Sequence, residues 1–197
     1  MSLKSLMSYT FVSKYARWCP QKKRRETWGE SVDRVRQMMV DKYVNVDSNK
    51  EILKYIDKAY GDMKKKKILG SQRALQFGGS PVFKHNARIY NCIASYIDRV
   101  RFFQECMYLL LCGCGTGFSV QKHHIAKLPT LIKEKHGQKK YVIEDSIEGW
   151  SDAVGVLVSS YFIKCNLFPE YNGKNIVFDY SQIRPAGAYL KSSGGKA

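Results

Sequence analysis

Six cysteines are the residues of this 197-residue chain that are most able to do chemistry. They are Cys19, Cys92, Cys106, Cys112, Cys114 and Cys165. None of them forms a C-x-x-C pair, and Cys112-Gly113-Cys114 is too closely spaced for a zinc knuckle, so we predict no metal site. Cys92 lies in the predicted short strand that ends at Ile93, where the pattern by itself favours a small core residue.

A second candidate is the glycine-rich run from Cys112 to Ser119. Its glycines allow positive φ and would let a substrate lie against bare backbone. Its amide N–H groups could hold a phosphate. The run follows a predicted helix, whereas the dinucleotide-binding fingerprint follows a strand and opens a helix. We therefore exclude a Rossmann site, and a tight helix-to-strand turn remains the alternative.

A third candidate is the basic loop that begins at Arg184 and continues to the end of the chain. Arginine and lysine on a glycine-rich loop suit a phosphate ligand, and an ordinary exposed loop is the alternative. No closing helix or strand follows the loop. A sheet that stopped here would keep an open apolar edge, so we expect another chain to complete the fold.

The composition indicates a globular protein with an anionic partner. Apolar residues make up 44% of the chain and charged residues 25%, which excludes a disordered tail or a disulfide-dense miniprotein. Lys and Arg number 33 against 17 Asp and Glu, a net charge of +16, which favours nucleotides, nucleic acid or another acidic surface as partner. The sequence has no 18-residue apolar run and no signal-peptide pattern, so we predict a cytoplasmic protein without a membrane partner.

Helical spacing dominates residues 1–66, the first predicted domain. Thr27 is a predicted N-cap with Glu30 as its capping-box partner. Apolar residues then recur at helical spacing from Val32 to Tyr43, and again from Ile52 to Met63. We predict two helices here.

Residues 67–197, the second predicted domain, alternate short apolar runs with longer helical patterns. Strands are predicted at 74–77, 89–93, 117–121 and 176–180, and helices over 100–111 and 147–161. This alternation predicts an α/β fold with parallel strand pairing.

Three blocks of residues, in this order, resemble the N-terminal part of the adenosylcobalamin-dependent (class II) ribonucleotide reductases. The first block is Tyr15 to Trp18 with Arg25 to Trp28. The second comprises Ser71 to Leu75, Asn91-Cys92, Glu105 to Tyr108 and Gly113 to Val120, and it closes with Lys127-Leu128-Pro129. The third comprises Glu148 to Trp150, Phe178 to Ser181 and Arg184 to Ala188. The resemblance covers about residues 14–197.

The resemblance implies a fold and a reaction. These enzymes reduce the 2′-carbon of a ribonucleotide inside a ten-stranded α/β barrel, of which this chain would form the first part after its helical N-terminal region. A protein thiyl radical, generated from adenosylcobalamin, takes the 3′-hydrogen, and a pair of cysteines then becomes a disulfide. Cys92 matches the first cysteine of that pair.

The resemblance also implies binding residues. Ser71 and Asn91 match positions that line the substrate, and Gly115, Gly117 and Ser119 match the glycine-rich strand beside it. Asp98 matches the position that holds the deoxyribose of a dNTP or ATP effector, and we expect it on the first turn of the following helix. The mobile loop between effector and substrate would contain Arg184, Gly194, Gly195 and Lys196.

The chain lacks the radical cysteine, the second cysteine of the pair and the cobalamin-binding region of the family. We therefore predict the N-terminal fragment of a reductase, made as a separate polypeptide through a split gene or a break at an intein or intron. It would be active only with a complementary C-terminal fragment and a thioredoxin-like reductant. One alternative is a non-catalytic nucleotide-binding or regulatory module derived from a reductase. The other is a basic nucleic-acid-binding protein, which we disfavour because basic residues occur along the whole chain without a binding motif.

Overall fold

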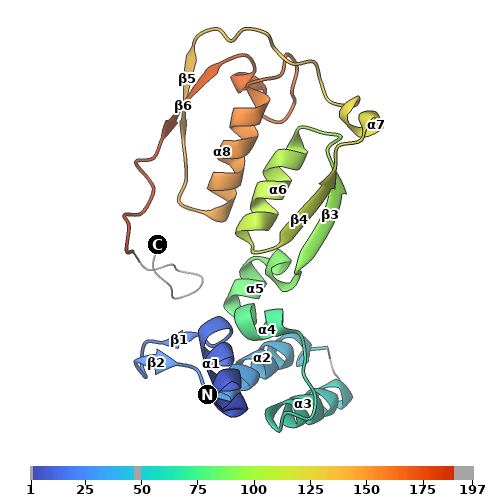
Figure 1. Cartoon of the computed structure of the whole chain (residues 1–197), viewed down its shortest axis with the longest axis vertical. Coiled ribbons are helices and arrows are strands. Elements are labelled where there is room, and N and C mark those ends of the chain that lie inside the picture. The colour runs from blue at the N-terminus through green and yellow to red at the C-terminus, as the bar shows by residue number, and fades with distance from the viewer. Residues whose placement is uncertain (1, 47–49, 189–197) are drawn as a thin grey trace. The chain divides into compact units, whose positions relative to one another are not determined.

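The computed structural model describes residues 2–46 and 50–188 (Figure 1). The chain divides into two compact units, the first reaching to Ile89 and the second running from Tyr90 to Ala186. We describe each unit by itself. The boundary predicted between residues 66 and 67 falls within the first unit. The predicted site residues Gly194, Gly195 and Lys196 lie outside the described residues.

The first unit is mainly helical. Its elements are α1 (Leu3–Lys14), β1 (Trp18–Cys19), β2 (Arg24–Arg25), α2 (Trp28–Tyr43), α3 (Glu51–Lys64), α4 (Gln72–Phe77), α5 (Ser80–Lys84) and the 3-10 helix η1 (Asn86–Ile89). β1 and β2 form a short antiparallel hairpin that the sequence analysis did not predict.

The two long helices of this unit confirm the sequence analysis. Thr27 caps α2 and shares a reciprocal capping box with Glu30, as predicted. The core contains Val32, Val35, Met63 and Leu75. Helices α2 and α3 therefore pack through the apolar positions that their spacing placed on one face.

The predicted strand at 74–77 is wrong, because these residues belong to helix α4. The amide of Gly78 donates to the carbonyl of Ala74 at 2.7 Å and closes the last helical turn. Leu75 is buried in the core. A four-residue apolar run does not distinguish a strand from a buried helical turn by its pattern, and packing decides the outcome here.

The second unit contains two β-α-β arrangements. Strands β3 (Cys92–Tyr96) and β4 (Gly115–Ser119) are parallel and are joined by α6 (Arg101–Leu111). Strands β5 (Gln138–Val142) and β6 (Asn175–Asp179) are parallel and are joined through α8 (Ile147–Ser159). The short helices α7 (Lys122–Ile125) and η2 (Pro169–Tyr171) lie in the connections. The predicted α/β class and parallel pairing are confirmed.

Two strand predictions in this unit need correction. The strand predicted at 89–93 starts later, at Cys92, because residues 86–89 form η1. Strand β5 was missed, because its lysines resemble an exposed basic loop. Lys140 forms an ion pair with Asp179 at 2.6 Å, and the Lys139 ammonium lies 4.6 Å from the centroid of the Tyr171 ring. Both lysines are therefore compatible with a strand, because the Asp179 carboxylate and the Tyr171 ring interact favourably with their ammonium groups.

Helices α6 and α8 pack against each other, as Figure 1 shows. Gly155 of α8 allows a close approach, because a Cβ atom at this position would lie 2.8 Å from Phe168 and 3.4 Å from Gln104 of α6. The helix pair thus holds the two β-α-β arrangements together. Within the described residues, no helix is long and apolar enough to cross a membrane.

Two glycine substitutions should change stability in opposite directions. A Cβ at Gly149, near the start of α8, would lie 2.3 Å from the carbonyl oxygen of Glu144, whereas one at Gly61 in α3 meets no atom within 4 Å. We expect Gly149→Ala to destabilise the second unit by about 1–3 kcal/mol through overpacking. Gly61→Ala should stabilise the first unit by up to about 1 kcal/mol through helix propensity.

Hydrogen exchange measured on peptides from α8 and α3 reports on the stability of each unit separately. Faster exchange in α8 of Gly149→Ala and slower exchange in α3 of Gly61→Ala are the expected results. Unchanged exchange of α8 in Gly149→Ala would contradict the close approach to Glu144.

Candidate functional site

Cys92 is the first residue of β3 and lies directly opposite Gly115, the first residue of β4. The same register places Ala94 opposite Gly117, and Tyr96 opposite Ser119. Side chains alternate between the two faces of a strand, so these six positions share one face of the β3–β4 ribbon. The structure therefore brings together four predicted site residues: Cys92, Gly115, Gly117 and Ser119.

Helix α6 covers the opposite face of the ribbon. The sulfur of Cys106 in α6 lies 3.2 Å from the hydroxyl oxygen of Thr116. The rings of Phe102 and Phe118 meet edge to face, with centroids 5.3 Å apart. The apolar side of the ribbon is thus used for packing, and the Cys92 side is not.

The Cys92 face is open and nearly free of side chains. Cys92, Ala94, Gly115 and Gly117 are all exposed. A Cβ at Gly115 would lie 3.6 Å from the Cys92 sulfur, and one at Gly117 would meet nothing within 4 Å. The Cys92 thiol therefore lies on bare backbone that a flat ligand can approach closely. The exposed position does not fit the core residue that the sequence pattern favoured, and it is compatible with the redox thiol that the resemblance implies.

The other cysteines have different surroundings. Cys112, Cys114 and Cys165 are buried. The Cys114 thiol donates to the carbonyl of Tyr90 at 3.3 Å, and the Cys165 sulfur lies 3.4 Å from the Ser159 hydroxyl. All six cysteines are free thiols. Among the described residues, no three His, Cys, Asp or Glu side chains gather as a metal site would require.

The glycine-rich turn does not offer its amides to a phosphate. The amides of Gly113, Cys114 and Gly115 donate to the carbonyls of Leu110, Leu109 and Asn91, at 2.9, 3.0 and 2.8 Å. Gly113 has φ of 92°, which the turn requires. Gly115 and Gly117 belong to strand β4 and not to the loop. What they contribute is the bare strand surface beside Cys92.

His124 closes one end of the open face, and the sequence analysis did not assign it a role. Its ring stacks on Tyr96 with a centroid distance of 4.6 Å, and its Nδ1 atom lies 3.2 Å from the Ser119 hydroxyl. Desolvation, followed by the nearby His123 and Lys127, lowers the pKa of His124, while Asp98 opposes the shift. The ring is therefore neutral at neutral pH and can exchange a hydrogen bond with Ser119.

A second candidate site surrounds Asp98, beyond the carboxyl end of β3. Asp98 lies in the connection before α6 and not on the first helical turn, which corrects the prediction. A cavity of about 420 Å³ is lined by Asp98 and by four cationic side chains, Arg99, Arg101, Lys127 and Lys164. Asp98 forms an ion pair with Arg99 at 2.8 Å. The excess of positive charge suits a phosphate, and the volume suits a small ligand.

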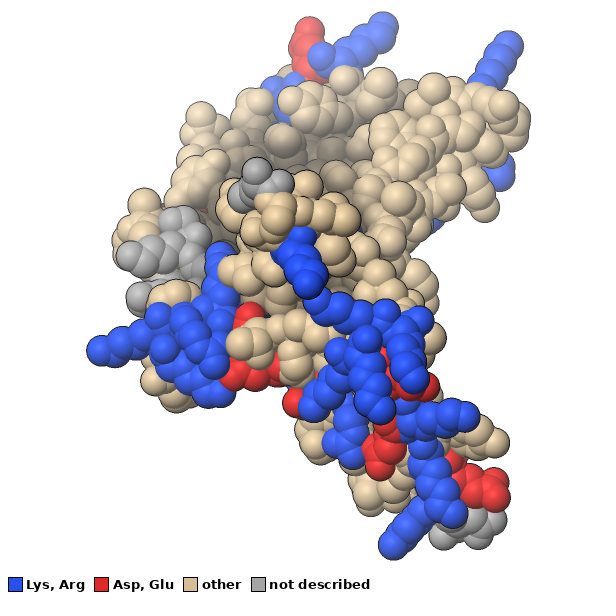
Figure 2. All heavy atoms as spheres, turned by 60° about the horizontal axis from the view of Figure 1, so that its bottom comes forward, with Lys and Arg blue, Asp and Glu red and all other residues tan. Residues whose placement is uncertain are grey.

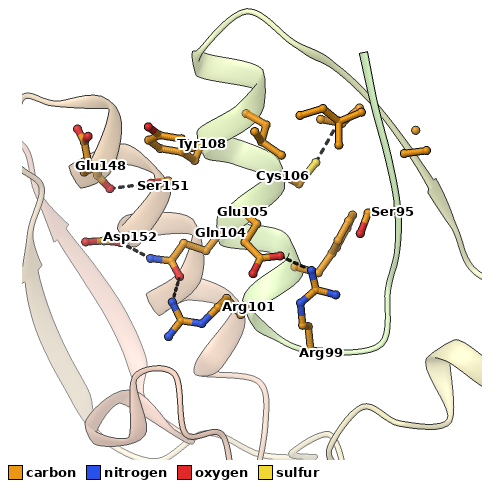
Figure 3. A pocket seen from close by; sticks show the side chains of 16 residues that line it. Ser95, Arg99, Arg101, Gln104, Glu105, Cys106, Tyr108, Glu148, Ser151 and Asp152 are labelled. Carbon is orange, nitrogen blue, oxygen red and sulfur yellow. Dashed lines mark hydrogen bonds and ion pairs between the residues drawn. The ribbon is translucent and has the colours of Figure 1, made fainter. Parts of the chain in front are cut away.

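A larger cavity of about 530 Å³ is bordered by β3, β4, α6 and α8 (Figure 3). Several of its polar groups engage one another. Glu105 pairs with Arg99, and Gln104 of α6 donates to Asp152 of α8. Gly117 is the one predicted site residue that lines it. We therefore assign this cavity to the junction of the two helices.

The remaining predicted residues lie apart from these sites. Arg184 donates through Nε to Asp145 at 2.5 Å, which ties the loop after β6 to the loop after β5. Asn91 directly precedes Cys92 and is exposed. Ser71 is exposed at the N-terminus of α4, in the first unit.

Comparisons with known proteins support the resemblance. No protein-family model matches this chain. The chain is 27% identical to the adenosylcobalamin-dependent ribonucleoside-triphosphate reductase of Lactobacillus gasseri, over 95% of this chain and 33% of that protein. It is 25% identical to the reductase of the same name from Lactobacillus leichmannii, over the same shares. The predicted resemblance to class II reductases is confirmed, and the chain spans about a third of the length of these relatives.

A solved structure agrees with this resemblance in fold. The crystal structure of a B12-dependent (class II) ribonucleotide reductase superposes with a TM-score of 0.80 and 22% identity. The match covers 96% of this chain and 34% of that chain.

A single added methyl group should test the geometry around Cys92. In Gly115→Ala the new methyl would lie 3.6 Å from the Cys92 sulfur, an ordinary contact that leaves the fold intact. We expect slower alkylation of Cys92 by iodoacetamide, followed by peptide mass spectrometry, and an unchanged melting temperature. Gly117→Ala is the matched control, because its methyl meets nothing within 4 Å. Equal alkylation rates in the two variants would argue against the Cys92–Gly115 register.

Proposed function

We propose that this chain is one part of a ribonucleotide reductase and supplies one reducing thiol, part of the substrate surface and the effector pocket. The observation that carries the proposal is the position of Cys92, exposed on bare backbone opposite Gly115. The named relatives are reductases of this type, and the chain matches a third of their length.

In the proposed reaction, Cys92 and a second cysteine outside this chain deliver two electrons. Both thiols lose a proton and together form a disulfide. The ribonucleotide loses its 2′-hydroxyl as water and gains hydrogen at that carbon. A dithiol reductant of the thioredoxin type then reopens the disulfide by exchange at an accessible sulfur. Cys92 meets the accessibility requirement, since it is the exposed cysteine among the six.

The proposed substrate surface is the open face of β3 and β4. Gly115 and Gly117 let a ribose approach the thiol without meeting a side chain. Ser119, with His124 at 3.2 Å, and the adjoining Asn91 supply polar groups at the two ends of this face. A largely bare surface with a few polar groups is typical of sites that orient one ligand.

The proposed effector site is the cavity around Asp98. Its carboxylate can accept a hydrogen bond from a sugar hydroxyl, and the surrounding cations can pair with the phosphates of a dNTP or ATP. The cavity of about 420 Å³ is large enough for part of a nucleotide. We propose that the loop after β6, which Arg184 ties to Asp145, carries the effector signal to the substrate surface, although neither residue lines this cavity.

Adenosylcobalamin, which the names of the relatives specify, does not fit the sites described in this chain. It supplies the radical that initiates reduction when bound to such enzymes. The cavities of the second unit, about 530 and 420 Å³, are of the size that holds drug-like ligands, and a corrinoid with its nucleotide is several times larger. We propose that the cofactor binds mainly to the remainder of the reductase.

The remainder of the reductase would also complete the barrel. In the described residues, each strand of the second unit pairs with a single neighbour, in two parallel two-stranded sheets. Parallel sheets are normally buried on both faces and flanked by further strands. We propose that the complementary part adds the missing strands of a ten-stranded barrel. Six free thiols fit a reducing compartment such as the cytoplasm.

Replacing Cys92 with serine should separate the chemical role from folding. We expect the Cys92→Ser chain, combined with the complementary part, adenosylcobalamin and a dithiol, to lose multiple turnover because serine cannot form the disulfide. Its melting temperature should stay unchanged, since the side chain is exposed and nearly isosteric. The assay measures deoxyribonucleotide formed per enzyme.

Cys106→Ser is the matched control, because Cys106 lies on the opposite side of the ribbon beside Thr116. It should keep turnover close to that of the unaltered chain. Normal turnover of Cys92→Ser would refute the redox role of Cys92. Turnover by the 197-residue chain alone would refute the proposal that catalysis needs the complementary part.

Substituting Asp98 should affect regulation more than chemistry. Asp98→Asn keeps the shape of the side chain and removes a charged hydrogen-bond acceptor. A hydrogen bond to a charged group contributes about 1.5–3 kcal/mol of free energy, which the variant would lose. We expect dNTP effectors to bind about tenfold or more weakly and the basal rate to change little. Equilibrium binding of dATP and dGTP measures the effect. Glu134→Gln, at an exposed position outside the cavity, is the control, and equal effector affinity in both variants would contradict the assignment.

A further inference from the structure

The positive charge of the protein is concentrated in the first unit. Residues 1–89 contain 20 Lys and Arg and 8 Asp and Glu, a net charge of +12. Residues 90–186 contain 11 basic and 9 acidic residues, a net charge of +2. Figure 2 shows basic side chains gathered over the helices of the first unit. The expectation that basic charge is spread along the whole chain is therefore corrected.

Four lysines form a stripe along helix α3. Lys54 and Lys58 lie one turn apart in the helix, and Lys50 and Lys65 are its N-cap and C-cap residues. Spacings of four and seven residues place Lys54, Lys58 and Lys65 on one side, opposite the buried Ile56 and Met63. Lys50 precedes them at the N-cap with left-handed backbone, φ of 56°. All four are exposed. We call Lys50, Lys54, Lys58 and Lys65 the lysine stripe.

The acidic residues of α3 do little to neutralise the lysine stripe. Asp57 is held by Arg36 of α2 at 2.5 Å, and Asp62 lies 4.0 Å from Lys67. Glu51, in the first turn, is the remaining carboxylate of this helix. The stripe therefore keeps a positive field that attracts an extended anion.

A solvated helix face would explain the lysines but not the aromatic residue beside them. Tyr55 precedes Lys58 by three residues, a spacing that makes side chains neighbours on a helix surface, and it is 74% exposed. An exposed aromatic ring next to a row of cations is the arrangement by which single-stranded nucleic acids are held, with bases on the ring and phosphates on the cations. An apolar protein partner would have to bury unpaired ammonium groups, which is costly.

We propose that the lysine stripe and Tyr55 bind single-stranded nucleic acid. Lys54 and Lys58 are separated by about 6 Å along the helix, and Lys58 and Lys65 by about 10 Å, so each can reach a different phosphate of an extended strand. Binding to a membrane surface would need an apolar face beside the basic one, and the apolar face of α3 is occupied by the core. This interaction is independent of the proposed nucleotide sites, which lie in the second unit.

The test uses the full chain and a fluorescein-labelled oligonucleotide of 20 thymidines, with binding followed by anisotropy between 50 and 200 mM NaCl. If four phosphates are neutralised, the logarithm of the association constant should fall against the logarithm of salt concentration with a slope of about −3. The triple variant Lys54→Gln, Lys58→Gln, Lys65→Gln should bind more than about tenfold more weakly, with a slope shallower by about 2.

The control variant Lys84→Gln, Lys122→Gln, Lys133→Gln removes the same charge from exposed positions outside the stripe. It should keep most of the affinity and the slope. Equal losses in the two triple variants would overturn the proposal, because they would show that net charge alone determines binding. Glutamine is a good helix former, so circular dichroism should show both variants folded.

Tyr55→Ala distinguishes base stacking on the ring from electrostatic attraction between the lysines and the phosphates. We expect about fivefold or greater loss of oligonucleotide affinity, no change in the salt slope and unchanged binding of inorganic polyphosphate. Stronger binding to phosphatidylserine vesicles than to the oligonucleotide, or displacement of the oligonucleotide by micromolar dATP, would overturn the proposal. The first result would indicate a membrane surface, and the second would locate the oligonucleotide in a nucleotide pocket.

Discussion

The parallel pairing of β3 with β4 is the constraint on which the candidate site depends. Two parallel neighbours need a crossover, and the crossover helix covers one face of the pair. Here α6 is that helix, and it occupies the face that carries Thr116 and Phe118. The alternation of side chains then leaves Cys92 and Gly115 on the other face, opposite each other. The same crossover places Asp98 at the carboxyl end of β3, where α/β proteins commonly bind ligands.

The sequence predicted the long elements well and the short ones poorly. The capping box at Thr27 and the periodicity of α6 and α8 are local signals, and they identified these helices. Residues 72–77 carry no comparable signal, and burial of Leu75 in the core selects a helix there. Strand β5 was not predicted because of its lysines. These lysines are compatible with a sheet only through their partners Asp179 and Tyr171.

The candidate sites could be predicted in part. The family resemblance selected Cys92 and Asp98, but the sequence does not encode which residues lie opposite them. The register that brings Gly115 beside Cys92 is set by hydrogen bonds between strands. The cations around Asp98 come from segments as far along the chain as Lys164, and His124 reaches the open face from the connection after β4. Such neighbours result from tertiary packing, to which local pattern analysis is blind.

The glycines of β4 are not explained by stability within the chain. Glycine within a strand loses more backbone entropy than alanine, by about 0.5–1 kcal/mol, and offers no side chain for packing. Gly117 has room for a Cβ, and at Gly115 a Cβ would make only an ordinary contact with Cys92, so sterics within the chain require neither glycine. Gly149 differs, because the nearby Glu144 carbonyl excludes a side chain there. Because the fold tolerates a larger residue at both positions and the strand would gain from one, the bare backbone fits the proposed close approach of a ligand to the Cys92 thiol.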